Sequence, residues 1–221
     1  EIILPPVARR VYKEMENDLL VYLERYTKEL DVVSDEEELE ASNAAVLVNK
    51  LLQIAAGNIY DAERVVQHIH DAKIVKLKAL LKRYKKEGKT VLIATTFIHS
   101  MEAILELPDV TRWNEKLLPK WCAGKIPIMV ADYRSISHGL NLQDGGSVLI
   151  WYSPTYSYEG TMQMDARLVR TGQKEVVNIH RLICKETIDE VVLESLRHKG
   201  GAMSTMLNTL KTLAYVDAID I

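Results

Sequence analysis

Short runs of β-branched and aliphatic residues alternate with helical patterns through the second half of the chain, and this alternation most constrains the fold. The apolar runs cover 90–95, 126–131, 147–152 and 176–183 ("TVLIAT", "IPIMVA", "SVLIWY", "VVNIHRLI"). The helical patterns cover 99–107, 158–170 and 187–199. Such alternation is typical of a parallel sheet with helices on both faces. The sequence therefore predicts an α/β fold from about residue 73 onward.

Helical periodicity dominates the part of the chain before this α/β region. Apolar residues recur at helical spacing over 7–30, and further helices are predicted at about 44–56 and 71–86. The acidic run 31–43 ("DVVSDEEELEASN") predicts a solvated linker, in which Ser34 and Glu37 also have the spacing of a capping box. We expect a helical lead-in over 1–70, the α/β domain over 71–200 and a helical tail over 201–221.

Charge and cysteine content exclude several classes of protein. The 221 residues carry a formal net charge of −3, which argues against a generally basic nucleic-acid coat but leaves local patches possible. Cys122 and Cys184 are too few for a disulfide framework or a metal set, so a reducing, cytoplasmic compartment is expected. No apolar run reaches membrane-spanning length. The first residue is Glu1 rather than Met, which suggests a piece of a longer protein.

The segment 86–90 ("KEGKT") imitates the end of a phosphate-binding loop. That loop needs a glycine five residues before Gly88, where this chain has Arg83. The loop would also follow a strand and open a helix, whereas here the helical pattern precedes and the strand follows. We therefore expect Gly88 to end a helix, and no ATP site of this type.

Two polar segments carry the residues that chemistry would need. The first, 135–146 ("SISHGLNLQDGG"), places small and amide side chains next to glycines after a predicted strand, where α/β folds bind ligands. The second, 163–173 ("QMDARLVRTGQ"), is predicted to be helical up to Gly172. On one helix Gln163, Arg167 and Arg170 would share a face, and two guanidinium groups suit a phosphate or carboxylate. Alone, such a stripe is as often a solvated face.

Together these segments resemble the carboxy-terminal lobe of superfamily-two helicases, and most closely the Swi/Snf-type DNA translocases of phage and prophage type. "TVLIATTFIHSMEAI", "SISHGLNLQ" and "QMDARLVRTGQ" resemble the fourth, fifth and sixth motifs of that lobe, in family order. "HDAK" at 70–73 resembles the segment that introduces the lobe, and "TIDEVVLESLRHK" resembles its last helix. The similarity is strong over about 73–199. The stretch 106–121 is short for the family, so a strand there is expected to be curtailed or missing.

The resemblance implies a RecA-like lobe that forms half of an ATP site. In such motors ATP with Mg²⁺ sits between two lobes, and the first lobe carries the phosphate loop that this chain lacks. By resemblance Arg170 would be the arginine finger, Arg167 a second phosphate contact, and Gln163 a positioner of phosphate or water. The loop with Gly139, Asn141 and Gln143 would couple the nucleotide state to DNA, touching the ribose or phosphates on one side and the DNA strand on the other. The chain alone is expected not to hydrolyse ATP.

The resemblance also implies DNA as a partner, contacted mainly through its phosphates and without sequence preference. The expected contacts are Thr96, His99, Ser100, Ser135 and Ser137. No metal site of the chain's own is expected, because His68 and His70 have no partner cluster. Two other classes stay open: a non-catalytic RecA-like module that binds DNA or a protein, and an unrelated α/β enzyme with a metabolite site.

Overall fold

A five-stranded parallel sheet forms the centre of the α/β region in this computed structural model, which describes residues 2–29, 36–136 and 140–197. Within these ranges, the side chains of residues 20–44 are not described. The strand order is β4-β5-β3-β6-β7, and all neighbouring strands are parallel. The strands are β4 (Val110–Arg112), β5 (Ile128–Asp132), β3 (Val91–Thr95), β6 (Val148–Trp151) and β7 (Asn178–Arg181). The predicted fold class is confirmed.

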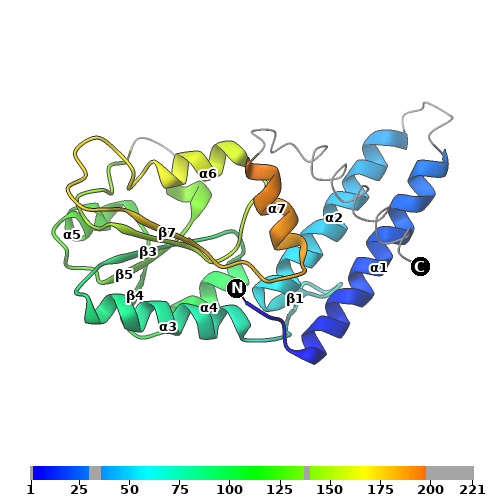
Figure 1. Cartoon of the computed structure of the whole chain (residues 1–221), viewed down its shortest axis with the longest axis horizontal. Helices are drawn as coiled ribbons and strands as arrows, with labels where there is room; N and C mark the ends of the chain where they lie inside the picture. The colour runs from blue at the N-terminus through cyan, green and yellow to red at the C-terminus, as the bar shows by residue number, and fades with distance from the viewer. Residues whose placement is uncertain (1, 30–35, 137–139, 198–221) are drawn as a thin grey trace. The chain divides into compact units, whose positions relative to one another are not determined.

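Helices cover both faces of this sheet. Figure 1 shows α3 (Ala72–Lys86) and α4 (Ile98–Leu105) on one face, and α5 (Leu118–Cys122) and α6 (Tyr158–Asp165) on the other. All five residues of β3 and all four of β6 are buried. Strands covered on both faces are apolar throughout rather than alternating, which is why these runs were visible in the sequence.

The core on the α5 and α6 side is built from alternate strand residues. Leu92 and Ala94 of β3, Met129 and Ala131 of β5, and Leu149 and Trp151 of β6 form one cluster with residues of the covering segments. These covering residues are Trp121, Ile126, Ile136, Leu142, Met164 and Leu168. The cluster therefore includes the loop that precedes β6 and the turn that follows α6, and it fixes both to the sheet.

The turn at Gly88 has the geometry expected of a helix end. Gly88 has a φ of 65°, a left-handed conformation that glycine adopts without strain. The N–H of Gly88 donates to the carbonyl of Lys85 at 3.3 Å, and the N–H of Lys89 donates to that of Tyr84 at 3.0 Å. This hydrogen-bond pair is the Schellman motif that ends α3. The interpretation of "KEGKT" as a helix end followed by a strand is confirmed.

The remaining described residues, those within 3–70 and 184–197, form a second compact unit. In it α1 (Pro6–Glu29) packs against α2 (Glu36–Ala56), and α2 packs against α7 (Ile188–Arg197). The Tyr12 hydroxyl accepts a 2.6 Å hydrogen bond from the N–H of Ile188. Strands β1 (Asn58–Tyr60) and β2 (Val66–His68) form an antiparallel hairpin.

Two boundaries differ from the expectations and one agrees with them. The α2 helix begins at Glu36, so most of the acidic run is helical rather than a linker. The strand expected to be curtailed or missing is curtailed, since β4 has only three residues. The sheet-bearing unit ends at Ile183, and α7 groups with α1 and α2 although the predicted domain ran to residue 200. The predicted tail over 201–221 lies outside the described residues.

Candidate functional site

The α6 helix ends before Arg167 and Arg170, although the sequence pattern predicted that both would be helical. The α6 helix ends at Asp165, and the following backbone closes shorter turns, from the N–H of Arg167 to Met164 and from that of Leu168 to Asp165. Arg167 is 8% exposed, whereas Arg170 is exposed. The prediction that Gln163, Arg167 and Arg170 form one helical stripe is therefore wrong, because only Gln163 is helical.

Arg167 joins this segment to the other polar segment. Its Nη1 atom donates a hydrogen bond to the carbonyl oxygen of Leu140 at 3.3 Å. Burial, and then the charge of nearby Arg170, lowers the pKa of Arg167. Two positive charges near each other, one of them desolvated, are stabilised by an anion bound between them. The guanidinium of Arg170 makes no ion pair among the residues that the structure describes.

The loop before β6 is fixed by a buried tryptophan. The indole N–H of Trp121 donates to the carbonyl of Leu142 at 2.9 Å, and Trp121 itself is fully buried. A Cβ atom at Gly145 would overlap the Trp121 ring, and one at Gly146 would overlap the Thr90 hydroxyl oxygen. Both positions therefore require glycine, because any side chain there would collide with Trp121 or Thr90.

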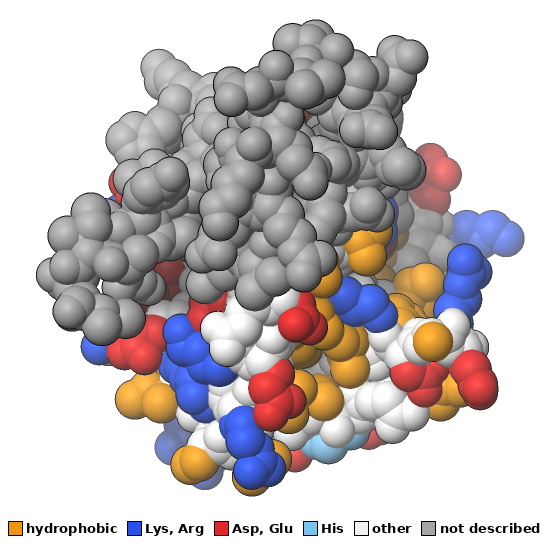
Figure 2. Space-filling view, turned by 90° about the vertical axis from the view of Figure 1, so that its right-hand side faces the viewer, with side chains coloured by type: hydrophobic (Ala, Val, Ile, Leu, Met, Phe, Trp, Pro, Cys, Tyr) orange, Lys and Arg blue, Asp and Glu red, His pale blue; other side chains and the backbone are white. Residues whose placement is uncertain are grey.

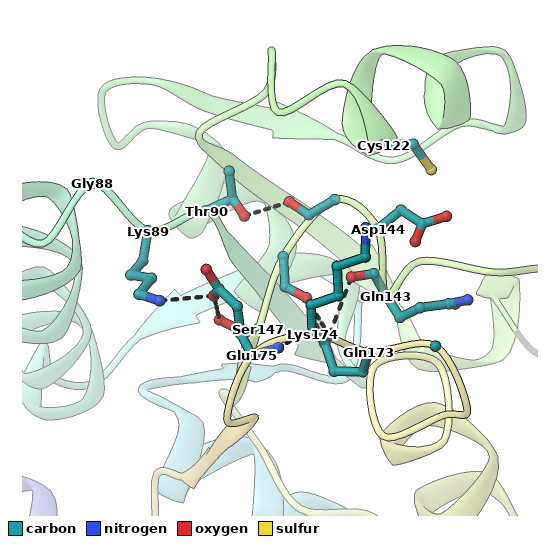
Figure 3. Close-up of a pocket in the computed structure, with 13 residues that line it drawn as sticks. Gly88, Lys89, Thr90, Cys122, Gln143, Asp144, Ser147, Gln173, Lys174 and Glu175 are labelled. Carbon is teal, nitrogen blue, oxygen red and sulfur yellow. Dashed lines mark hydrogen bonds and ion pairs between the residues drawn. The ribbon is translucent and has the colours of Figure 1, made fainter.

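A cavity of about 480 Å³ opens at the amino ends of β3, β6 and β7. Its walls come from 88–90, Cys122, 143–147 and 172–175. Figure 3 shows Lys89 and Ser147 converging on Glu175, with contacts of 2.7 Å and 2.5 Å to its Oε2 atom. These two hydrogen bonds lower the pKa of Glu175. Gln143, one of the predicted nucleotide-facing residues, also lines this cavity.

The opposite, carboxyl edge of the sheet holds a second group of predicted residues. Arg134 pairs with Asp132 through two hydrogen bonds, at 2.9 Å and 2.7 Å, and its Nη2 atom also donates to the Thr96 carbonyl at 3.3 Å. The hydroxyl of exposed Ser135 donates to the Asp132 carbonyl at 2.7 Å. The Thr96 hydroxyl is buried and has no hydrogen-bond partner among the described residues. Thr96 and Ser135 are thus brought together at the ends of β3 and β5.

His99 and Ser100 are buried rather than presented at the surface. They are 3% and 0% exposed, His99 stacks on the ring of Phe97 at 5.2 Å, and the Ser100 hydroxyl lies 3.3 Å from its Nδ1 atom. Burial lowers the pKa of His99 to about 4. Direct side-chain contact of these two residues with a phosphate would require α4 to rearrange. Their backbone N–H groups lie in the first turn of α4, where donors are left over.

The other predicted residues are dispersed. Gln163 lies on α6, and its Nε2 atom donates to Glu159 on the same helix at 2.8 Å. Asn141 is exposed, and its carbonyl lies 3.7 Å from the Cys122 sulfur. Ser137 and Gly139 lie outside the described residues. Within 2–29, 36–136 and 140–197, no group of three or more His, Cys, Asp or Glu side chains could hold a metal ion.

Surface charge and hydropathy add two observations. Figure 2 shows basic, acidic and hydrophobic side chains intermixed over the described part of one face, with no field of a single sign. None of the helices in the described part of the chain is both long and apolar enough to cross a membrane.

Comparison with known proteins gives no match to any protein-family model. Two curated relatives are putative protein p41 of Acyrthosiphon pisum secondary endosymbiont phage 1 and human chromodomain-helicase-DNA-binding protein 1. The first is 36% identical over 217 residues, which are 94% of this chain and 44% of p41. The second is 26% identical over 157 residues, 63% of this chain and 9% of its relative. The chain thus spans less than half the length of either relative.

Solved structures decide the fold. The C-terminal part of the Fun30 ATPase domain aligns with a TM-score of 0.68 at 17% identity, over 99% of this chain and 96% of that one. The chain has the fold of the carboxy-terminal lobe of a Swi2/Snf2-type ATPase. The Sulfolobus solfataricus SWI2/SNF2 ATPase core in complex with dsDNA aligns with a TM-score of 0.59 at 16% identity, over 89% of this chain and 42% of that chain. The predicted resemblance to a Swi/Snf-type lobe is confirmed, while the roles of single residues stay predictions.

Two residues with several contacts in this lobe were not singled out from the sequence. Arg134 lies beside Thr96 at the carboxyl edge, and the only sequence signal is a basic residue two positions after a strand. Gln173 connects the two polar segments through its side chain. It is the last residue of the segment that resembles the sixth motif, but nothing in the spacing indicates which backbone groups its amide contacts.

Proposed function

We propose that this chain is the second motor lobe of an ATP-dependent DNA helicase or translocase, whose phosphate-binding loop and acidic pair belong to a first lobe. The contact between Arg167 and the Leu140 carbonyl carries the proposal, because it joins a partly desolvated guanidinium, with Arg170 near enough to lower its pKa, to the loop proposed to touch the nucleotide. The fold of the Swi2/Snf2 ATPase cores and the sequence similarity to a helicase support it.

In this proposal Arg170 reaches the γ-phosphate and Arg167 is a second phosphate contact. Phosphoryl transfer depends mainly on positioning and charge neutralisation, and an arginine finger contributes about 10³–10⁵ in rate. Arg170 is exposed and forms no ion pair with any residue that the structure describes, so its side chain can cross to a nucleotide held by another lobe. Arg167 has less freedom, because it is buried and hydrogen-bonded.

Gln163 positions phosphate or the attacking water. The loop with Gly139, Asn141 and Gln143 touches the nucleotide on one side and the DNA strand on the other, and so couples the nucleotide state to DNA. The Mg²⁺ that accompanies ATP is held by the phosphates and the first lobe. The chain alone, without a phosphate loop, does not hydrolyse ATP.

The carboxyl edge of the sheet is the proposed DNA-facing side. The N–H groups at the start of α4 offer neutral donors to phosphate oxygens. The Ser135 hydroxyl would exchange its hydrogen bond to the Asp132 carbonyl for one to a phosphate oxygen, and the buried Thr96 hydroxyl would have to be uncovered first. Neutral donors of this kind bind the phosphate backbone of DNA without selecting a base sequence. His99 and Ser100 take part through their N–H groups, and Ser137 through its hydroxyl. The Sulfolobus core, which binds dsDNA, has the same fold, and this supports the assignment.

The test is ATP hydrolysis by the complete polypeptide that carries both lobes, with and without duplex DNA. The proposal expects hydrolysis that rises at least tenfold with DNA, and none from residues 1–221 alone. DNA binding without any hydrolysis by the complete polypeptide would favour the alternative, a non-catalytic RecA-like module that binds DNA or a protein.

A further inference from the structure

Gln173 uses the full hydrogen-bonding capacity of its side-chain amide. Its Nε2 atom donates to the carbonyl oxygens of Gln143 and Gly146, both at 3.1 Å, with a longer contact to Leu168 at 3.4 Å. Its Oε1 atom accepts from the N–H groups of Lys174 and Glu175 at 2.9 Å and 3.0 Å. The reverse amide orientation would place donors against donors, so these partners fix the orientation.

The partners of this amide belong to both polar segments. Gln143 and Gly146 lie on the loop before β6, and Leu168 lies between Arg167 and Arg170. Figure 3 shows the Gln173 side chain reaching from its own turn to the Gln143 side of the cavity. Arg167 makes a second connection between the same segments at Leu140. Because both connections end on backbone carbonyls, they position the chain itself rather than one mobile side chain.

The other side of the loop is equally confined. Trp121 holds the Leu142 carbonyl, and Gly145 has no room for even a Cβ atom next to the indole. The loop therefore lies between the fixed Trp121 ring and the Gln173 amide. A loop packed on one side and hydrogen-bonded on the other moves together with the segment that holds it.

This loop is the far end of a stretch that starts at the carboxyl edge of the sheet. Ser135, a proposed DNA contact, lies at one end, and Gly146, held by Gln173, lies at the other. A displacement at the DNA end can bias the arginines through the connections between the two segments. Ile136 and Leu142 of the first segment pack with Met164 and Leu168 of the second in one core cluster. Among the hydrogen bonds, the Gln173 amide supplies two connections and Arg167 supplies one.

We propose that Gln173 is a positioning residue that couples DNA binding to the placement of Arg167 and Arg170. The inference rests on the proposed function. It adds that DNA stimulation of hydrolysis, rather than nucleotide binding, depends on the Gln173 amide. Gln173 itself touches neither nucleotide nor DNA.

The test compares Gln173→Glu with wild type in the complete two-lobe polypeptide. The glutamate keeps an acceptor for the N–H groups of Lys174 and Glu175 but turns a carboxylate oxygen toward the carbonyls of Gln143 and Gly146. Gln173→Met, which removes both functions without adding charge, is the second variant in case the glutamate does not fold. Lys125→Gln makes the same change in net charge at an exposed position and is the control.

The measurements are kcat and KM for ATP with and without duplex DNA, together with urea unfolding to verify folding. We expect DNA stimulation to fall at least tenfold in Gln173→Glu and Gln173→Met, while DNA-free turnover and KM stay within threefold of wild type. Unchanged stimulation would overturn the inference, as would an equal fall of DNA-free and DNA-stimulated turnover, which marks a merely structural role. Wild-type polypeptide without DNA-stimulated hydrolysis would instead overturn the proposed function, and this inference with it.

Discussion

The indole N–H of Trp151 donates a hydrogen bond to a carboxylate oxygen of Asp165 at 2.8 Å. The other oxygen of the same carboxylate pairs with Arg181 at 2.6 Å. One side chain thus joins the last residue of α6 to both β6 and β7. Since the arginine-bearing turn begins at the next residue, this carboxylate determines where that turn starts.

Replacing Asp165 by Asn is expected to destabilise the protein by about 1–2 kcal/mol, because a hydrogen-bonded, partly buried ion pair is lost. Urea unfolding measures this cost, and a double-mutant cycle with Arg181→Gln should give a coupling of about 1 kcal/mol. The control is Asp109→Asn, whose exposed pair with Lys85 should contribute less than about 0.5 kcal/mol. Equal costs for Asp165→Asn and Asp109→Asn would contradict the assigned role.

The close approach of Gly145 to Trp121 predicts a steric effect. A Gly145→Ala substitution introduces a Cβ into the indole ring of Trp121 and should cost about 2–3 kcal/mol in unfolding free energy. Gly124→Ala is the comparison, since no atom lies within 4 Å of a Cβ there and only its φ of 67° adds strain, about 1 kcal/mol. If Gly145→Ala proves no more costly than Gly124→Ala, the loop is looser than described.

Burial of His99 predicts a pH dependence of stability. Its pKa is about 4 in the folded chain, below the ordinary value of 6.5, so the unfolded chain binds the proton more tightly. Stability from this group is complete above pH 6.5 and is lost as the pH falls toward 4. Between pH 7 and pH 5 wild type should lose about 2 kcal/mol more than His99→Asn. Urea unfolding at both pH values decides, and parallel losses in the two proteins would exclude a buried neutral His99.

Ser135 offers a test of the DNA-facing edge. The Ser135→Ala variant should bind duplex DNA about threefold to tenfold more weakly, the effect of one lost neutral hydrogen bond. The loss should be the same on two unrelated duplexes, because phosphate contacts carry no sequence information. The slope of affinity against salt should not change, since no charge is removed. Fluorescence anisotropy measures the affinity, its dependence on DNA sequence and its dependence on salt. An unaltered affinity would show that Ser135 does not contact DNA.

Much of the α/β region could be predicted because its strands are buried on both faces. The runs that became β3, β5 and β6 are apolar throughout, and each begins or ends near a glycine or polar turn. The end of α6 could not be predicted, because Ala166, Arg167 and Leu168 favour helix by intrinsic propensity. Tertiary contacts override that preference: Asp165 is held by Trp151 and Arg181, and Arg167 turns to Leu140.

The two segments that form the candidate site could be predicted from the sequence, but the contacts between them could not. Family resemblance pointed to 135–146 and 163–173, and the structure joins them. Sequence spacing contains no information on the Gln173 amide, whose partners lie 27 and 30 residues away along the chain. Likewise, the burial of His99 and Ser100 arises from packing of α4 and from the Phe97 ring, which a local pattern of polar residues does not reveal.

The central claim is that this lobe supplies an arginine finger to a nucleotide held by another lobe. DNA-stimulated ATP hydrolysis by the complete polypeptide, wild type beside Arg170→Ala, tests it most directly, with Arg112→Ala at an exposed position of β4 as the control. The account predicts a fall in kcat of about a hundredfold or more in Arg170→Ala alone, with nucleotide affinity retained. Hydrolysis by Arg170→Ala at the wild-type rate would contradict it.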